Sequence, residues 1–266
     1  MVFEVLITGF GPFASFKLNP SWLAVKGLHG TYHCQGKLHV QCLQVPVCYS
    51  AVLDTIPRLY GLQPSSRSAK PWLDPNGDLS GAAGDGSPYP CGYQVQHPSS
   101  GYDLILHVGV GKAGGIECET QAHKSGYRLR DSNKSLAPLI SAGRHGQTIE
   151  QVPKQDDSGI RGFGQGYEDF EEIEKSLLNV DNLVQRLNTI ESVRGLVTAS
   201  IDPGRFLCDF IYYCSLAEGK RAGGGKTPCV FIHIPPIDQP LSTEACSEAI
   251  KEAILFLAKS LGHFES

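Results

Sequence analysis

Cys208 and His233 are the residues whose types and places in the sequence best suit nucleophilic chemistry. Cys208 lies near the start of a predicted helix, where partial positive charge favours an anion. A thiol held there ionises more readily and becomes a nucleophile. His233 ends an apolar run that stops at Pro235, so it is expected at the carboxyl edge of a sheet, where active sites of open α/β sheets gather. The two residues predict thiolate chemistry assisted by an imidazole.

A structural role is the alternative for each of these two residues. A cysteine in a helix is most often a small core residue, and a histidine in a strand is most often held by structural hydrogen bonds. The spacing between Cys208 and His233 does not decide between the two interpretations. If Cys208 were structural, Cys214 would be the next thiol to consider.

The helix that would carry Cys208 has signals at both ends. Asp202 is the predicted N-cap, because its carboxylate can accept the unpaired amide N–H groups of the first turn, and Pro203 suits the first helical position. Gly219 is predicted to close the helix in the left-handed conformation. Between them, one apolar stripe has helical spacing: Leu207, Phe210, Ile211 and Cys214. Cys208 lies about 100° around the axis from that stripe and faces another edge.

Two blocks around these residues resemble a known family. Residues 204–210 read Gly-Arg-Phe-Leu-Cys-Asp-Phe, and residues 231–236 read Phe-Ile-His-Ile-Pro-Pro. They are similar to the pyroglutamyl peptidase I family, also called pyrrolidone-carboxyl peptidase, in its helix start around the cysteine and its strand end around the histidine. The resemblance implies a cysteine peptidase that uses Cys208 and His233. Two further blocks match the same family, so the resemblance covers nearly the whole chain.

A carboxylate is the expected third member of such a site, because it holds the tautomer of the histidine and stabilises the imidazolium. Glu117 and Glu119 both follow the Gly-rich turn at residues 111–115. In an extended segment they point the same way, so alternation leaves both open. The spacing Glu119-x-x-x-His123-x-x-Gly126-Tyr127 resembles the family's catalytic Glu block, which implies Glu119, with Glu117 in reserve.

A Gly-rich loop follows the first predicted strand and reads Gly-Phe-Gly-Pro-Phe over residues 9–13. Its proline removes a donor N–H and no Gly-Lys-Ser/Thr follows, so the loop is a poor phosphate cradle. Together with Asn-Pro-Ser-Trp at residues 19–22 it resembles the same family, which implies that Phe10 and Phe13 line the substrate pocket. Bacterial members carry a glutamine in the later Gly-rich turn, where this chain has Lys112, so that role is not transferred.

A metal site was considered for one group of histidines and cysteines: His29, His33, Cys34, His39 and Cys42. His39 and Cys42 are three residues apart, so they face opposite sides of a strand. No pair in the group has the spacing of a known zinc clip. We therefore expect no metal, and the family resemblance implies no organic cofactor.

Charge and composition exclude several classes of protein. A formal net charge of −4 and a pI near 6.1 argue against a nucleic-acid surface, which needs a basic patch. No apolar run reaches the ~18 residues that span a bilayer, and the amino terminus leads into a strand without the basic region of a signal peptide. Nine cysteines without a framework spacing indicate reduced thiols. We expect a cytoplasmic protein of undecided oligomeric state.

The pattern predicts one α/β domain over residues 1–266, a three-layer α/β/α sandwich around a largely parallel twisted sheet. Strands are predicted at residues 3–8, 38–47, 104–110, 196–200 and 230–234, and helices at 21–28, 170–187, 203–219 and 243–261. Residues 62–100 are rich in Gly, Ser and Pro, and we expect an inserted surface loop that is partly disordered. Residues 141–166 form a second polar excursion.

The function implied by the resemblance is hydrolysis of the amide bond after an N-terminal pyroglutamate, through a Cys208 thiolate and a thioester, with His233 and Glu119 completing a triad. Its partners would be peptides that begin with pyroglutamate. One alternative is an inactive scaffold that binds a peptide or small acyl ligand, favoured by the insertions, by Pro203 and by the altered Gly-rich turn. The other is a cysteine amidase of different acyl specificity. A nucleotide-binding enzyme fits least, because no loop has the full phosphate fingerprint.

Overall fold

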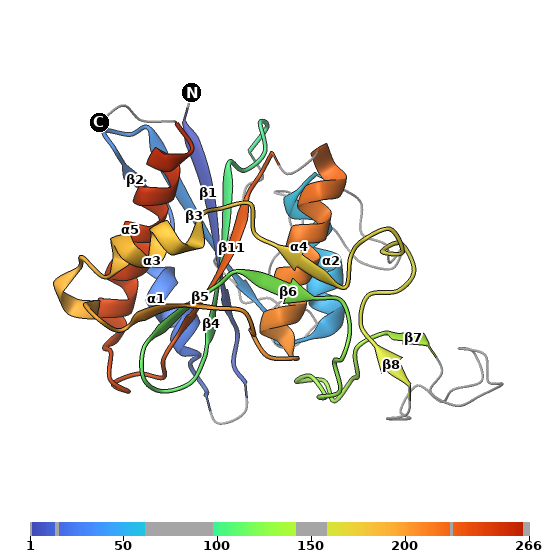
Figure 1. Cartoon of the computed structure of the whole chain (residues 1–266). Coiled ribbons are helices and arrows are strands. Elements are labelled where there is room, and N and C mark those ends of the chain that lie inside the picture. The colour runs from blue at the N-terminus through green and yellow to red at the C-terminus, as the bar shows by residue number, and fades with distance from the viewer. Residues whose placement is uncertain (1, 14–15, 62–97, 142–158, 224–225, 263–266) are drawn as a thin grey trace.

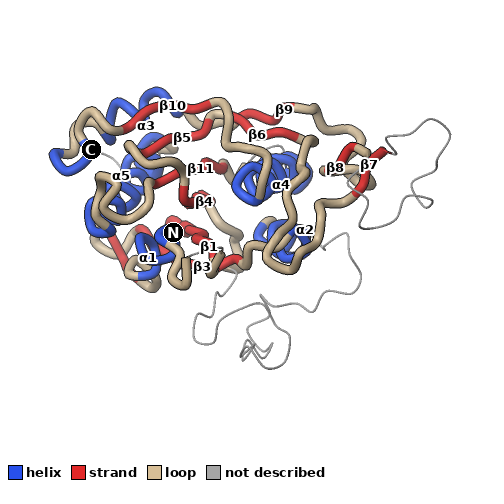
Figure 2. The backbone as a smooth tube through the Cα atoms, turned by 90° about the horizontal axis from the view of Figure 1, so that it is seen from below, coloured by secondary structure: helices blue, strands red, loops and turns tan. Residues whose placement is uncertain are grey.

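A central seven-stranded sheet separates two layers of helices (Figures 1 and 2). The computed structural model describes residues 2–13, 16–61, 98–141, 159–223 and 226–262. The order of the strands is β10 (Val197–Ser200), β5 (Ile116–Glu119), β11 (Cys229–Ile234), β4 (Leu104–Val110), β1 (Phe3–Phe10), β3 (Leu38–Val45) and β2 (Thr31–His33). The predicted three-layer α/β class is therefore confirmed.

The sheet is largely parallel, but strands run the other way at both edges, β2 beside β3 on one side and β5 with β10 on the other. Strands β3, β1, β4 and β11 are parallel, whereas β5 pairs with β11 in the antiparallel direction and β10 pairs with β5 in parallel. Because β5 runs opposite to β11, Glu117 pairs with His233 near the end of β11, and Glu119 pairs with Phe231, two residues earlier in β11. This reversal places the two glutamates of β5 next to the histidine strand.

Alternating side chains of the strands build a core on each face of the sheet. Val5 and Ile7 of β1 pack under α1 (Pro20–Lys26), α3 (Val180–Leu187) and α5 (Thr243–Ser260), whereas Leu6 and Phe10 lie on the face of α2 (Tyr49–Leu59) and α4 (Leu207–Gly223). Period-two alternation of strand side chains produces this division. Each fully buried aliphatic or aromatic side chain contributes about 1.5–3 kcal/mol.

Smaller strand pairs lie beyond the sheet: β6 (Gln121–His123) with β9 (Ile173–Lys175), and β7 (Leu139–Ser141) with β8 (Ile160–Arg161). The predicted helix over residues 170–187 is wrong in its first half, since β9 occupies that part and α3 begins at Val180. The side chain of Asn179 accepts the Asn182 amide at 2.9 Å, which fixes this later start. A short 3-10 helix (Glu191–Val193) leads to β10.

Both predicted ends of the Cys208 helix are wrong. Helix α4 begins at Leu207, and Asp202 instead closes a turn by accepting the Gly204 amide at 3.2 Å and the Arg205 guanidinium at 2.9 Å. Gly219 lies inside the helix, where a Cβ would approach the Tyr60 ring to 3.2 Å. The loop at 203–206 therefore delays the helix and places Cys208 in its first turn.

The predicted insertions lie mostly outside the described residues. Of the expected loop at 62–100, only 98–100 are described, and of the excursion at 141–166 the range 142–158 falls outside. Within the part of the chain that the structure describes, no helix combines the length and apolar character that crossing a membrane requires.

Candidate active site

The pairing register of the sheet brings four chemically important positions onto one face. His233 of β11 lies directly opposite Gly109 of β4 and Glu117 of β5, and Phe231 lies opposite Glu119. Residues two apart on a strand face the same side, so the imidazole and both glutamates share the face covered by α4. Residues more than one hundred positions apart in the chain thus meet near the end of β11.

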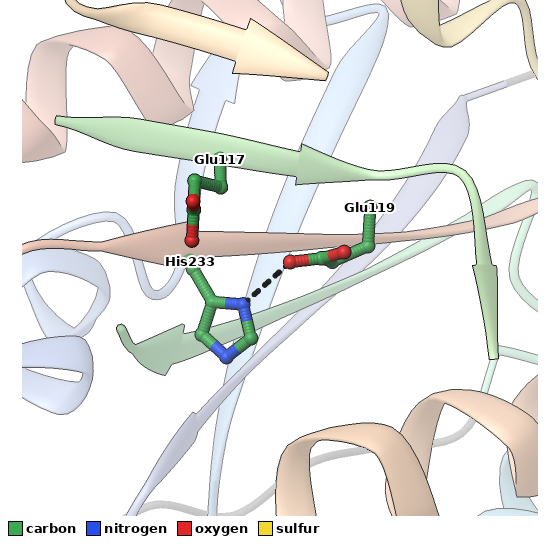
Figure 3. A group of neighbouring side chains, drawn as sticks. All are labelled: Glu117, Glu119 and His233. Carbon is green, nitrogen blue, oxygen red and sulfur yellow. Dashed lines mark hydrogen bonds and ion pairs between the residues drawn. The ribbon is translucent and has the colours of Figure 1, made fainter. Parts of the chain in front are cut away.

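His233 and Glu119 form a buried pair. The imidazole Nδ1 donates to the Glu119 Oε1 at 2.8 Å, and the two residues are 6% and 0% exposed. A carboxylate only accepts, so this hydrogen bond keeps the proton on Nδ1 and leaves Nε2 for other partners. Figure 3 shows the second ring nitrogen pointing away from both glutamates. The backbone carbonyl of Glu119 accepts from the Tyr212 hydroxyl at 3.0 Å, which ties the end of β5 to α4.

Cys208 approaches the imidazole from the first turn of α4. It interacts with the imidazole closely enough to raise the pKa of His233, and its side chain is partly exposed. Its sulfur lies over Gly109, where a Cβ would come within 2.8 Å of Sγ and within 2.7 Å of the Phe231 ring. A glycine is therefore required on β4, because any side chain there would displace the sulfur or the ring.

The charge state of His233 follows from these neighbours. Burial alone lowers its pKa, but the interactions with Cys208 and with the carboxylate of Glu119 outweigh burial and raise the pKa to about 10. At neutral pH the ring is therefore protonated on both nitrogens and positively charged. A protonated imidazole beside a thiol places an acid next to a side chain that can act as a nucleophile.

A second histidine–carboxylate pair lies on the other side of Cys208, and sequence reasoning missed it. Asp209 is fully buried and accepts the His123 amide at 2.9 Å, the His123 Nδ1 at 3.2 Å and the Arg205 guanidinium at 3.3 Å. Burial raises the pKa of Asp209 to about 8, although the His123 amide and Arg205 oppose the rise. Both residues lie in the sequence blocks that resemble the family, but no sequence pattern predicts a contact between two residues that are 86 positions apart.

The two predicted pocket residues differ in exposure. Phe10 is only 4% exposed and belongs to the core on the α4 face, whereas Phe13 is partly buried against that core. The Phe13 ring meets the Phe206 ring with centroids 5.3 Å apart. Phe206, two residues before Cys208, was missed because its aromatic partner lies far away in sequence. Lys112, in the turn after β4, is exposed.

One group of side chains in the described residues has donor atoms close enough to hold a metal ion. Glu117, Glu119 and His233 each offer an atom within 4.8 Å of the others. Two carboxylates and an imidazole are ligands that zinc accepts, but Nδ1 of His233 already donates to Glu119. The histidines and cysteines near residues 29–42 do not form such a group; His39, for example, pairs with Glu4 at 2.8 Å.

Comparisons with known proteins agree with one another. A family model described as pyroglutamyl peptidase matches residues 3–62. The chain is 27% identical to pyroglutamyl-peptidase 1 of Mus musculus over 251 residues, which cover 94% of this chain and 87% of that protein. It is 26% identical to pyroglutamyl-peptidase 1 of Homo sapiens over 253 residues, with the same coverage of each chain.

Solved structures share the fold. A mutant pyrrolidone carboxyl peptidase from Pyrococcus furiosus matches with a TM-score of 0.64 at 20% identity, covering 97% of this chain and 99% of that one. Pyroglutamyl peptidase I from Bacillus amyloliquefaciens matches with a TM-score of 0.61 at 21% identity over the whole of both chains. These two likenesses establish a common architecture. The family model and the mammalian relatives add sequence similarity, so the resemblance to the pyroglutamyl peptidase family that the motifs predicted is confirmed.

Proposed function

We propose that this chain is a cysteine exopeptidase that hydrolyses the amide bond after an N-terminal pyroglutamate. The family relationship supports the substrate class. The observation that carries the mechanism is the chain of contacts from Cys208 through His233 to Glu119, in which Nδ1 and Oε1 are 2.8 Å apart. A nucleophile, a base within hydrogen-bond reach and a third group that orients the base are the features that covalent catalysis requires.

In the first half of the reaction, the Cys208 thiolate attacks the carbonyl carbon that joins the pyrrolidone ring to the next residue. The tetrahedral oxyanion is stabilised by amide N–H groups at the start of α4, including that of Cys208. The His233 imidazolium gives its Nε2 proton to the leaving amine as the C–N bond breaks. The products are a peptide shortened by one residue and a pyroglutamyl thioester on Cys208.

In the second half, the now neutral His233 takes a proton from water, and the hydroxide adds to the thioester carbonyl. The C–S bond then breaks, pyroglutamate leaves, and the thiolate–imidazolium pair is restored. Glu119 keeps the ring oriented and stabilises its charge throughout. Phe10 and Phe13 supply apolar walls for the uncharged lactam ring, whose polar atoms would be recognised by a few backbone hydrogen bonds.

The test is turnover of three fluorogenic amides that differ only in their acyl group: pyroglutamyl, prolyl and glutamyl. We expect cleavage of the pyroglutamyl amide, loss of that cleavage to background in Cys208→Ala, and retention in Cys214→Ala, whose thiol is fully buried. Retained turnover in Cys208→Ala would refute the nucleophile. Equal or faster cleavage of the prolyl or glutamyl amide would instead support a cysteine amidase of other specificity.

A further inference from the structure

Glu117 is a second carboxylate beside the imidazole that the mechanism above does not use. It lies directly opposite His233 in the β5–β11 ladder, two residues before Glu119 on the same face. One oxygen of each glutamate and one ring nitrogen of His233 all lie within 4.8 Å of one another. Figure 3 shows both glutamates extending from β5 toward the ring.

Both carboxylates retain unused acceptor capacity. The carboxylate of Glu117 has no hydrogen-bond or ion-pair partner among the described residues, and Glu117 is partly exposed. Glu119 is fully buried, and its Oε2 has no hydrogen-bond partner within the described part of the chain. No hydrogen bond joins the two carboxylates, and each has an oxygen close to the ring.

We propose that Glu117 is a positioning residue for His233: it stabilises the imidazolium alongside Glu119 and accepts the Nδ1 hydrogen bond when the carboxylate of Glu119 is removed. The ladder fixes the Cα of Glu117 opposite that of His233, so only side-chain rotation is needed to bring an oxygen from within 4.8 Å to hydrogen-bond distance. A glutamate has three side-chain torsions with staggered alternatives, which makes this movement feasible.

Glu117 has the weaker influence of the two carboxylates on the ring. Water reaches it, and solvent screens its charge, whereas Glu119 acts inside the protein through a direct hydrogen bond. Within the described residues, the titratable groups that act on the ring or lie beside it include Cys208 from α4 and these two glutamates from β5. An opposite charge close to an imidazole favours its protonated form, so Glu117 favours charge on the ring.

The direct test measures the pKa of the His233 ring by NMR in a Cys208→Ser background, where no thiolate contributes. We expect Glu117→Gln to lower this pKa by about half to one unit, because an opposite charge within ~4–6 Å favours the protonated ring. Glu191→Gln is the matched control, since its side chain is 84% exposed and paired with Arg194. An unchanged pKa in Glu117→Gln would overturn the proposal. This arm does not depend on peptidase activity.

The kinetic arm rests on the proposed function and uses a cycle of Glu117→Gln, Glu119→Gln and the double variant with the pyroglutamyl amide. We expect a kcat loss of about twofold to fivefold for Glu117→Gln, at most about 10²-fold for Glu119→Gln, and about 10³–10⁴-fold for the double variant, the range for losing an orienting carboxylate. A double variant equal to Glu119→Gln within a factor of about two would refute the back-up role. Failure of the wild type to cleave any reporter would refute the proposed function and leave the NMR result standing.

Discussion

Two histidine–carboxylate pairs lie near Cys208, and the pKa of the imidazole is raised in one pair and lowered in the other. In the His233–Glu119 pair, the neighbouring thiol and the carboxylate raise the pKa of the imidazole to about 10 despite burial. In the His123–Asp209 pair, burial and the charge of Arg205 lower the pKa of the imidazole. The residue types are nearly the same. Burial lowers the pKa of both imidazoles; Cys208 and Glu119 reverse that effect at His233, whereas Arg205 adds to it at His123.

The two pairs also differ in the role that we assign to them: His233–Glu119 takes part in the reaction, and His123–Asp209 supports the structure. In the proposed mechanism, the His233 ring delivers a proton to the leaving group. The His123 pair instead joins β6 to the first turn of α4, since the backbone amide of His123 donates to Asp209 at 2.9 Å. One pair holds a mobile proton, and the other holds the helix that carries Cys208.

The largest expected difference between the two pairs is the loss of kcat when each imidazole is replaced. His233→Gln should lower kcat for the pyroglutamyl amide by about 10³–10⁴-fold, because it removes a general acid and base. His123→Gln should keep kcat within about fivefold, since the backbone amide still donates to Asp209 and the new side chain can donate as well. Equal losses in the two variants, with both proteins folded by circular dichroism, would contradict the division of roles.

A smaller loss is expected from filling the space beneath the sulfur. A Cβ at position 109 would lie 2.8 Å from the Cys208 Sγ, so Gly109→Ala must shift the thiol relative to His233. A displacement near 1 Å costs about 10²-fold in rate, and overpacking of this kind costs roughly 1–3 kcal/mol of stability.

The matched control for that substitution is Gly27→Ala. Gly27 ends α1 in the right-handed region, and nothing lies within 4 Å of its Cβ position. This variant should keep both kcat and the melting temperature. If Gly109→Ala also kept full activity, the sulfur would not lie where the account places it.

The smallest expected effect is the pH dependence of stability, which has opposite signs for the two pairs. The raised pKa of His233 gives a contribution that is complete below its unfolded pKa near 6.5 and is lost as the pH rises toward about 10. The lowered pKa of His123 gives a contribution present above pH 6.5 and lost as the pH falls through its folded pKa.

Melting temperatures across pH 5 to 10 would measure these contributions. His233→Gln should flatten the alkaline side of the profile and His123→Gln the acid side. Flattening on the same side in both variants would show that the two imidazoles do not differ in charge.

Local patterns and motifs predicted much of the scaffold. The apolar runs at 3–8, 104–110 and 230–234 are strands of the central sheet, and the pattern at 243–261 is α5. The α/β class followed from the alternation of strands and helices, and the family resemblance followed from the sequence motifs. Helix α2 was missed; its Cys48 N-cap position makes no side-chain cap hydrogen bond, and Pro57 lies inside it.

The wrong predictions concern features that depend on distant contacts. Asp202 is a residue type that often caps the start of a helix. Here its carboxylate accepts hydrogen bonds from Gly204 and Arg205 in a turn, and the helix begins later, at Leu207. The pairing of Asp209 with His123 and the meeting of Phe13 with Phe206 join separate parts of the chain. The reversed direction of β5, which sets Glu117 and Glu119 beside His233, follows from tertiary pairing and has no local signal.

Competition between two thiols in one molecule tests the central claim most directly. Cys34 is exposed, whereas Cys208 is partly buried beside His233, so simple access favours Cys34. With limiting iodoacetamide at pH 6, the account predicts that peptide mapping finds the label on Cys208 first, and that activity falls in proportion to it. Faster labelling of Cys34, or full activity after Cys208 is alkylated, would contradict an activated thiolate at the start of α4.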